Sequence, residues 1–327
     1  MEEQIDILMA TYNSNIEYLK KQIESILNQT YKNIKLIISD DNSTNKEVQE
    51  ELKKYQIKDK RIDLYIQEKN LGYTKNFGFL LEKSTAKYIM FSDHDDIWYE
   101  NKVQKSLEKL KKENVDLIYV NSNQINEKGE KIQENYFKYK NVPLINKESK
   151  LAISRCAGIG CSQIFTESVK EKMIPFKDSV MAHDWLAGFI ANELKGLTYI
   201  EEPLFGYRLH NTNVFGGRSF SQNIDRWKKE NGNSYRSYLK YRKEKVIDKA
   251  YLDGAKMCNE YRLEDKNKKF IDDLVSYLEN IEKSKYVNWH LTKYFKFFAG
   301  KNLLKKMIKE IMIFHFPILG YIVFKYQ

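Results

Sequence analysis

The sequence predicts an α/β fold, a mostly parallel sheet flanked by helices, with an α-helical extension at its C-terminal end. Two observations support this. Short apolar runs alternate with segments of helical periodicity through the first part of the chain, which is typical of βαβ units. After Gly216 the alternation stops, and the rest is lysine- and tyrosine-rich with helical spacing. We therefore expect a sheet domain over residues 1–216 and a helical region over residues 217–327.

The expected strands are short apolar runs bounded by polar turns. Along the chain they cover residues 5–9, 34–39, 62–66, 88–92, 117–120, 163–166 and 197–200. Helices are expected near residues 16–27, 46–55, 74–82, 103–110 and 183–194, where apolar residues recur at helical spacing. Ser14 and Glu17 have the spacing of a capping box before the first helix. A polar hairpin and loop is expected over residues 125–150, with its turn at Glu127–Glu130.

Composition limits the class of protein. The 327 residues are 42% hydrophobic and 31% charged, which indicates a globular chain with a large core. The formal net charge of +10 indicates an anionic partner: nucleic acid, an acidic lipid surface or phosphorylated substrates. Three cysteines without paired spacing are typical of a reducing compartment. No signal peptide and no transmembrane run are expected, so we predict a cytoplasmic protein.

The most informative stretch follows the strand expected at residues 88–92. Asp93, Asp95 and Asp96 come directly after it, with His94 among them. Carboxylates this close repel one another, and a divalent cation compensates that repulsion. Oxygen ligands suit Mg²⁺ or Mn²⁺, which in turn binds a phosphate or diphosphate. The alternative is a solvated acidic turn.

Two other strands also end in polar residues. Thr11–Tyr12 follows the first strand and Asp40–Asp41 the second. The carboxyl ends of parallel strands meet at one edge of a sheet, so these groups and Asp93–Asp95 are expected to converge on a ligand. The first strand-to-helix turn lacks the glycines of a dinucleotide fingerprint, and no P-loop motif is present.

Two later segments carry further candidates. Asp184 stands at the start of a helix, where an aspartate is usually an N-cap, and residue type alone favours the cap over catalysis. Arg208 and His210 lie in one short segment and could both face a diphosphate. The small-residue segment Ala157–Ser162 is either a close approach to a ligand or a tight bend, and the sequence leaves both open.

Near the C-terminus, lysines alternate with large apolar residues. This pattern over residues 293–312 is typical of a helix lying in a membrane interface. The alternative is a helix packed on its own domain with a solvated basic face.

Taken together, these motifs resemble those of the family 2 glycosyltransferases, the inverting nucleotide-sugar enzymes with the Rossmann-like GT-A fold. The chain is most similar to the bacterial rhamnosyltransferase and polysaccharide-assembly branches of that family. The resemblance extends over residues 5–214. The motifs that carry it are Ala10–Asn13, Ser25–Tyr31, Ile37–Thr44, Asn70–Gly72, Ser92–Trp98, His183–Trp185 and Tyr207–Asn211. Ala10 departs from the pattern, because many relatives have Pro or Thr there.

The resemblance implies roles for the nucleotide-binding residues. Thr11, Tyr12 and Asp41 would hold the base and ribose, with Asp41 accepting from the pyrimidine imide. Lys75 would lie near the diphosphate, and Asp93 would bind ribose or a metal-bound water.

It also implies the metal and catalytic groups. Asp93 and Asp95 form the family's Asp-x-Asp element, with Asp95 as a ligand of Mn²⁺ or Mg²⁺, and His210 would contact the metal or diphosphate. Asp184 falls where the family has its catalytic base. The resemblance therefore favours a catalytic role for Asp184 over that of an N-cap alone. One carboxylate that deprotonates the acceptor hydroxyl is what an inverting transfer needs.

The resulting prediction is a metal-dependent inverting glycosyltransferase of polysaccharide synthesis, peripheral at the inner membrane face. Its donor would be dTDP- or UDP-linked, with dTDP-rhamnose the first choice, and its acceptor a saccharide or lipid-linked saccharide. An anionic membrane surface is an expected partner, nucleic acid is not, and a homodimer stays open. The alternatives are a metal-dependent phosphoesterase and a nucleic-acid-binding protein.

Overall fold

The structure is a computed structural model of the chain. It describes residues 2–140, 142, 144–146, 158–174, 176, 182–210, 227–241, 268–269, 271–272 and 275–276. Its contacts divide the chain into two compact units, Met1–Leu209 and His210–Gln327. The predicted domain boundary at Gly216 and the predicted interfacial segment at residues 293–312 lie outside the described residues, so both stay predictions.

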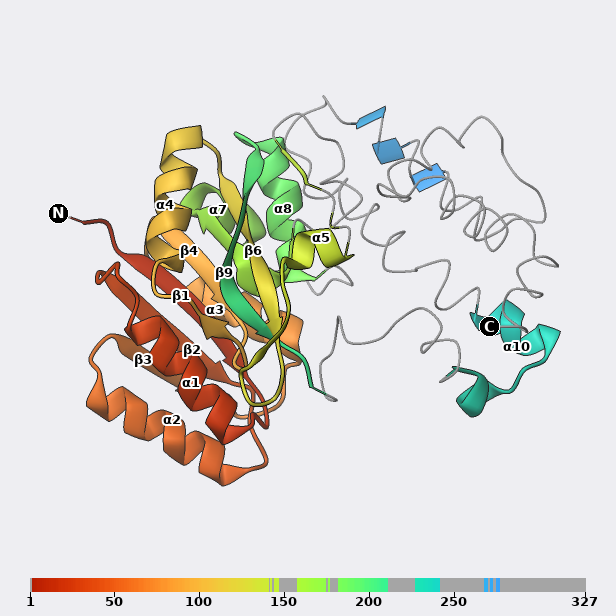
Figure 1. The fold of residues 1–327 in the computed structure, drawn as a ribbon, viewed down its shortest axis with the longest axis horizontal. Coiled ribbons are helices and arrows are strands. Elements are labelled where there is room, and N and C mark those ends of the chain that lie inside the picture. The colour runs from red at the N-terminus through yellow and green to blue at the C-terminus, as the bar shows by residue number, and fades with distance from the viewer. Residues whose placement is uncertain are drawn as a thin grey trace. The chain divides into compact units, whose positions relative to one another are not determined.

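The first unit contains a nine-stranded mixed sheet (Figure 1). Its strands are β1 (Ile5–Thr11), β2 (Ile34–Asp40), β3 (Ile62–Ile66), β4 (Tyr88–Ser92), β5 (Ile97–Trp98), β6 (Leu117–Ile125), β7 (Lys131–Gln133), β8 (Gln163–Thr166) and β9 (Leu197–Arg208). Their order across the sheet is β3-β2-β1-β4-β8-β6-β9-β5, and β7 pairs with β6. The strands β3, β2, β1 and β4 are mutually parallel, as is the pair β6 and β9. The predicted mostly parallel sheet is confirmed.

The helices cover both faces of this sheet. They are α1 (Ile16–Leu27), α2 (Lys46–Lys58), α3 (Tyr73–Lys83), α4 (Lys102–Glu113), α5 (Tyr136–Lys140), the 3₁₀ turn η1 (Gly160–Ser162), α7 (Glu167–Met173) and α8 (His183–Glu193). One core packs alternate residues of β1 against α1, α2 and α4. On the opposite face, Phe77 of α3 contacts Phe91 of β4, which in turn contacts Phe165 of β8. The helix α10 (Tyr235–Tyr241) belongs to the second unit.

Three local features differ from the expectations. The cap of α1 is Asn15, whose side chain accepts from the N–H groups of Glu17 and Tyr18, so the predicted capping box at Ser14 is wrong. The last strand continues to Arg208 instead of ending near residue 200. Finally, β8 is antiparallel to both of its neighbours, β4 and β6. Short apolar runs carry no signal for strand direction, which is fixed by pairing.

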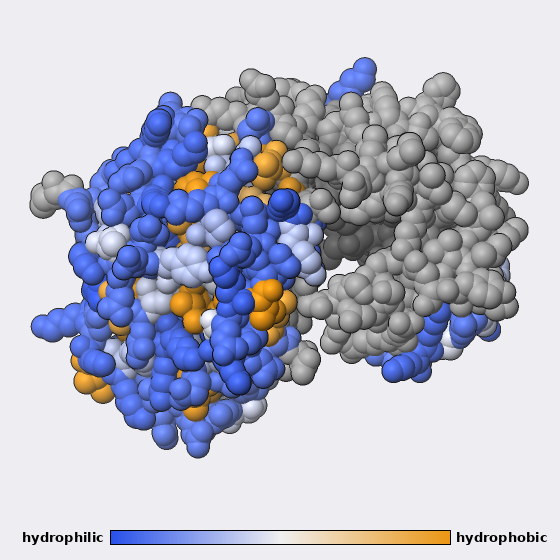
Figure 2. All heavy atoms as spheres, in the orientation of Figure 1, coloured by the Kyte–Doolittle hydropathy of each residue, from blue (hydrophilic) through white to orange (hydrophobic). Residues whose placement is uncertain are grey.

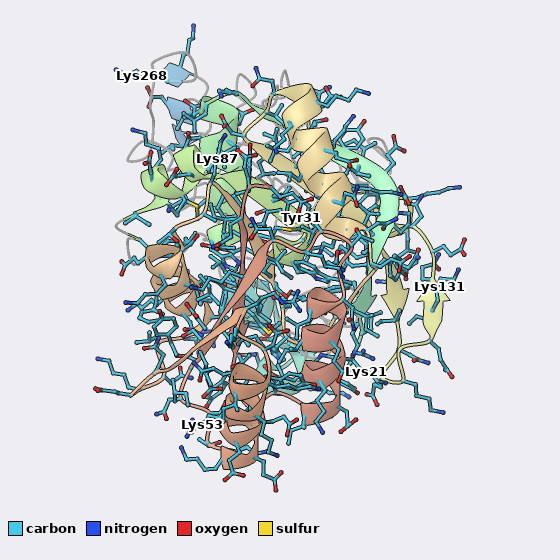
Figure 3. All side chains as sticks on the ribbon, turned by 90° about the vertical axis from the view of Figure 1, so that its left-hand side faces the viewer. Lys21, Tyr31, Lys53, Lys87, Lys131 and Lys268 are labelled. Carbon is cyan, nitrogen blue, oxygen red and sulfur yellow. The ribbon has the colours of Figure 1, made fainter. Side chains whose placement is uncertain are left out.

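The face of the first unit seen in Figure 2 is largely hydrophilic, with small separate hydrophobic areas. Lys21 on α1 and Lys53 on α2 point outward from their helices (Figure 3). Among the described residues, no helix combines the length and apolar character needed to cross a membrane.

Candidate active site

The candidate site begins where β1, β2 and β4 end at the same edge of the sheet. Thr11 closes β1 and pairs in register with Asp40 at the end of β2. Its side chain is buried, and its hydroxyl donates to Oδ1 of Asp40 at 3.0 Å. The structure therefore gives the Thr11 hydroxyl a partner within the protein, and its contact with a nucleotide stays a prediction.

Asp40 is expected, with Asp41, at the ligand-binding edge of the sheet, but the local pattern did not indicate that it holds the loop after β2. It is fully buried and also accepts from the N–H of Ser43 at 2.9 Å, the hydroxyl of Ser43 at 2.6 Å and Nε2 of Gln49 at 3.1 Å. These bonds fix the loop after β2. An aspartate three residues before a serine is a local turn signal that could have identified it.

Asp41 ties this loop to the turn before α3. One carboxylate oxygen accepts from the N–H of Leu71 at 2.6 Å, and the other accepts from the N–H of Gly72 at 2.9 Å. The side chain of Asn70 donates to the Asp41 carbonyl at 3.2 Å. Gly72 has a φ of +82°, which favours glycine. The Asn70–Gly72 motif is thus held against the end of β2 by the carboxylate predicted to read the base.

Exposed side chains flank this loop. Tyr12 follows β1 and is 46% exposed, and Lys75 is exposed in the first turn of α3. Both are accessible to a ligand. Asn76, next to Lys75, is buried and bonds to Ser39 through both its amide oxygen and its amide nitrogen, which anchors α3 to β2.

The acidic turn, Asp93–Asp96, follows β4 and contains two carboxyl groups with strongly raised pKa values. Within the described residues, ligand atoms of Asp93, Asp96 and Cys161 all lie within 4.8 Å of one another. Burial raises the pKa of Asp93 to about 6, with further contributions from the charges of Asp95 and Asp184. Burial, followed by the charges of Asp95 and Asp93, raises the pKa of Asp96 well above its usual range. Burial and neighbouring carboxylates therefore make full ionisation of this turn unfavourable unless a cation compensates the charge.

These residues fit a divalent cation. Oδ2 of Asp96 is buried and makes no hydrogen bond within the described part of the chain. Carboxylate oxygens are the ligands that Mg²⁺ and Mn²⁺ prefer, whereas the Cys161 thiol is a softer group. Asp95 lies near enough to affect Asp93 and Asp96, but it is not in the cluster of ligand atoms, so its metal role stays a prediction.

Arg208 lies behind the acidic turn. It is fully buried; its Nε donates to the Asp95 carbonyl at 2.6 Å, and its Nη1 donates to the carbonyls of Asn126 and Glu127 at 2.8 Å each. Its guanidinium also lies 4.3 Å from the ring centroid of Tyr18. These bonds hold two turns together, and the predicted contact of Arg208 with a diphosphate stays a prediction.

Lys102 is a second buried basic residue, and no local sequence pattern indicates its burial. Its Nζ donates to the Cys161 carbonyl at 2.6 Å and lies 3.5 Å from the ring centroid of Trp98. Burial lowers the pKa of Lys102 to about 7, although the charges of Cys161, Asp96 and Asp93 act in the opposite direction. A lysine at the start of a helix would ordinarily be expected in solvent.

Asp184 stands in the first turn of α8, partly exposed and close to the acidic turn. Its Oδ1 accepts from the N–H of Trp185 at 2.8 Å. The preceding His183 is buried and stacks on Phe77 at a centroid distance of 3.9 Å. Burial lowers the pKa of His183 to about 4. The structure therefore brings Asp184 together with Asp93, on the side of the site away from β3.

His210, the remaining predicted residue, is the first residue of the second unit. Its predicted contact with the metal or diphosphate stays a prediction.

The chain is similar to known glycosyltransferases over much of its length. The model of glycosyl transferase family 2 matches residues 6–171 of the chain. The glycosyltransferase MJ1057 of Methanocaldococcus jannaschii is 31% identical over 224 residues, which cover 67% of this chain and 76% of that protein.

Two other relatives have more specific names. The dTDP-rhamnosyl transferase RfbG of Shigella flexneri is 27% identical over 64% of this chain and 73% of RfbG. The Escherichia coli UDP-Glc:alpha-D-GlcNAc-diphosphoundecaprenol beta-1,3-glucosyltransferase WfgD is 31% identical over 37% of this chain and 47% of WfgD. A glycosyltransferase of Rickettsia bellii is 34% identical over 39% of this chain, and the matched segment makes up 18% of the length of that protein.

Solved structures share the fold. Residues 1–349 of TarS from S. aureus superpose with a TM-score of 0.54 at 14% identity, over 98% of this chain and 89% of that one. The mannosyltransferase PcManGT from Pyrobaculum calidifontis, in complex with GDP-Man and Mn²⁺, gives a TM-score of 0.51 at 11% identity, over 100% and 86% of the two chains. These neighbours confirm the predicted GT-A fold. With the acidic turn at the end of β4 and the family match through residue 171, they lead to one conclusion: the chain belongs to glycosyl transferase family 2.

Proposed function

We propose that this protein is a metal-dependent inverting glycosyltransferase that moves a sugar from a nucleotide-sugar donor to a saccharide or lipid-linked saccharide. The observation that carries the proposal is that Gly160 packs on Asp184 while the adjacent Cys161 lies beside Asp93 and Asp96, which brings the candidate base and the acidic turn together. A base and a diphosphate site next to each other are what a single displacement needs.

In the proposed reaction, a carboxylate oxygen of Asp184 accepts the proton of the acceptor hydroxyl. That hydroxyl oxygen forms a bond to the anomeric carbon while the bond from this carbon to the diphosphate breaks, and the electron pair leaves with the phosphate oxygen. Displacement from the opposite side inverts the anomeric centre. Asp184 is partly exposed, so an acceptor can reach it.

Asp93 and Asp95 would hold Mn²⁺ or Mg²⁺, with Asp96 as a further oxygen ligand in the same turn. The bound cation would neutralise charge on the leaving diphosphate. The Mn²⁺ complex of PcManGT supports this part of the proposal. Lys75, exposed at the start of α3, would add a positive charge near the same phosphates.

On the other side of the site, Thr11, Tyr12 and Asp41 would hold the nucleoside. The name of RfbG supports dTDP-rhamnose as the first donor to test, and the name of WfgD supports UDP-glucose as the second. WfgD also names a diphosphoundecaprenol acceptor, which supports a lipid-linked acceptor and work at the inner membrane face. The family assignment gives no support to a phosphoesterase or a nucleic-acid-binding protein.

The test begins with thermal-shift binding of nucleotides and nucleotide sugars, with and without Mn²⁺, followed by transfer assays with the donors that bind. Asp184→Asn should abolish transfer and leave nucleotide binding nearly intact. Asp95→Ala should lose the Mn²⁺-dependent part of nucleotide binding. The anomeric configuration of the product, read by NMR, tests inversion.

Asp63→Asn is the matched control. Asp63 on β3 forms an ion pair with Lys35 on β2, away from the acidic turn. It should leave both transfer and binding unchanged. Continued transfer by Asp184→Asn would show that another group is the base.

A further inference from the structure

The turn Ile159–Gln163, here called the 159–163 turn, touches Asp184. A Cβ on Gly160 would lie 3.2 Å from Oδ2 of Asp184 and 3.3 Å from its Cβ, so the carboxylate packs directly on the glycine. Gln163 donates from Nε2 to the Asp184 carbonyl at 3.0 Å. Both contacts bear on the position of the candidate base.

The same turn also touches the acidic turn. The Sγ of Cys161 lies within 4.8 Å of ligand atoms of both Asp93 and Asp96. Two consecutive residues, Gly160 and Cys161, therefore face the base and the acidic turn respectively. Whatever fixes the 159–163 turn fixes the spacing between these two parts of the site.

Lys102 is the group that holds this turn from within the protein. Its Nζ donates to the Cys161 carbonyl at 2.6 Å, and the side chain is fully buried between the rings of Trp98 and Phe205. Burying an ammonium group is costly unless it is well compensated. An apolar residue would fill the same space at lower cost, so the buried amino group and its hydrogen bond to the Cys161 carbonyl indicate a role other than packing.

We propose that Lys102 is a positioning residue that fixes the 159–163 turn through the Cys161 carbonyl and thereby sets the spacing between Asp184 and the acidic turn. This inference rests on the proposed function, in which Asp184 is the base. It concerns the rate of the transfer step, because the residues proposed to hold the nucleoside, at the ends of β1 and β2, are not part of the 159–163 turn.

Lys102→Met tests the proposal, because methionine fills a similar volume without charge or donor. Replacing a buried charge by an apolar residue of similar volume is often neutral for stability, so the variant should fold. We expect kcat to fall on the order of 10- to 100-fold, the effect of a base displaced by about 1 Å. Mn²⁺-dependent nucleotide affinity and donor KM should stay within about twofold.

Gly160→Ala tests the opposite end of the same turn. The added methyl group would press on the Asp184 carboxylate and should give the same signature, a lower kcat with unchanged nucleotide affinity. Ser106→Ala is the matched control for Lys102→Met. Ser106 lies on the same helix, α4, and its buried hydroxyl makes no hydrogen bond within the described residues, so kcat should be unchanged.

A readout independent of activity completes the design. Hydrogen exchange of amides in peptides covering residues 159–166 and 182–190 should accelerate in Lys102→Met and not in Ser106→Ala. Unchanged exchange, or a folded Lys102→Met with wild-type kcat, would overturn the proposal, as would a parallel loss of nucleotide affinity. If the wild-type protein transfers no sugar, the proposed function fails, while the exchange data still decide whether Lys102 fixes the turn.

Discussion

The main-chain N–H of Arg208 donates a 3.0 Å hydrogen bond to Oδ1 of Asp96, a residue 112 positions earlier in the chain. The side chain of the same arginine donates to the carbonyls of Asp95, Asn126 and Glu127. The end of β9 thus holds the acidic turn against the turn between β6 and β7. Three segments that are distant in the chain therefore meet here: the acidic turn, the turn between β6 and β7, and the end of β9.

Arg208→Lys should loosen this arrangement. A lysine has one nitrogen and cannot donate to three carbonyls in the planar geometry of a guanidinium, so buried acceptors lose their partners. We expect a loss of about 2–4 kcal/mol in the free energy of unfolding and weaker Mn²⁺-dependent nucleotide binding. Urea unfolding and calorimetric titration measure the two effects.

Arg61→Lys is the control for this substitution. Arg61 pairs with Asp59 near the surface, and the loss there should be at most about 1 kcal/mol. An Arg208→Lys variant as stable as Arg61→Lys would contradict the role given to Arg208.

Gly72→Ala should destabilise the turn before α3 through the backbone alone. No atom lies within 4 Å of the position that a Cβ would take, but the φ of +82° is unfavourable for alanine. We expect a cost of about 1–3 kcal/mol, together with weaker nucleotide binding because the Gly72 N–H bonds to Asp41. Glu82→Ala, an exposed change in the same helix, should alter stability by less than about 0.5 kcal/mol. Equal stabilities of the two variants would argue against strain at Gly72.

His183 should make stability depend on pH in the acidic range. Burial lowers its pKa from 6.5 to about 4, so the unfolded chain binds a proton that the folded protein does not. Stability contributed by this group is therefore full above pH 6.5, falls as the pH drops toward 4 and is then constant. The total loss is roughly 3 kcal/mol.

The measurement is chemical unfolding at a series of pH values for the wild type and His183→Phe, which keeps an aromatic ring against Phe77. The variant should lack this part of the pH dependence. Identical pH profiles would show that His183 is protonated in the folded protein or exchanges with solvent.

Asp6→Asn should change stability without changing transfer. The fully buried carboxylate of Asp6 accepts from the hydroxyl of Ser84 and the N–H groups of Thr85 and Ala86 at 2.8–3.0 Å, at the start of β1. All three donors face Oδ2, so the asparagine oxygen can take its place, but the bonds lose their charge assistance, which should cost about 1–2 kcal/mol. Activity per folded molecule should equal that of the wild type. Reduced activity at full folding would show that the two ends of β1 are coupled.

Local pattern was enough to predict most of the sheet and the polar strand ends. The alternation of apolar runs gave β1 to β4, and the polar residues after them gave Asp41 and Asp93. It failed for the cap of α1 and for the extent of β9, where residues near Pro203 broke the apolar pattern although the strand continues. It also missed that Asp40 and Asn76 are buried and anchor neighbouring elements, because a buried polar residue and an exposed one look the same in a sequence.

The sequence by itself determined the order of the strands along the chain, the chemistry at their carboxyl ends and the family, because these depend on residue type and spacing. Only the tertiary structure decided that Lys102 lies beneath Cys161, that Arg208 is buried behind the acidic turn and that Asp184 lies close to Asp93. These relationships join residues up to 113 positions apart. They depend on which groups the fold removes from water, and spacing along the chain does not record that.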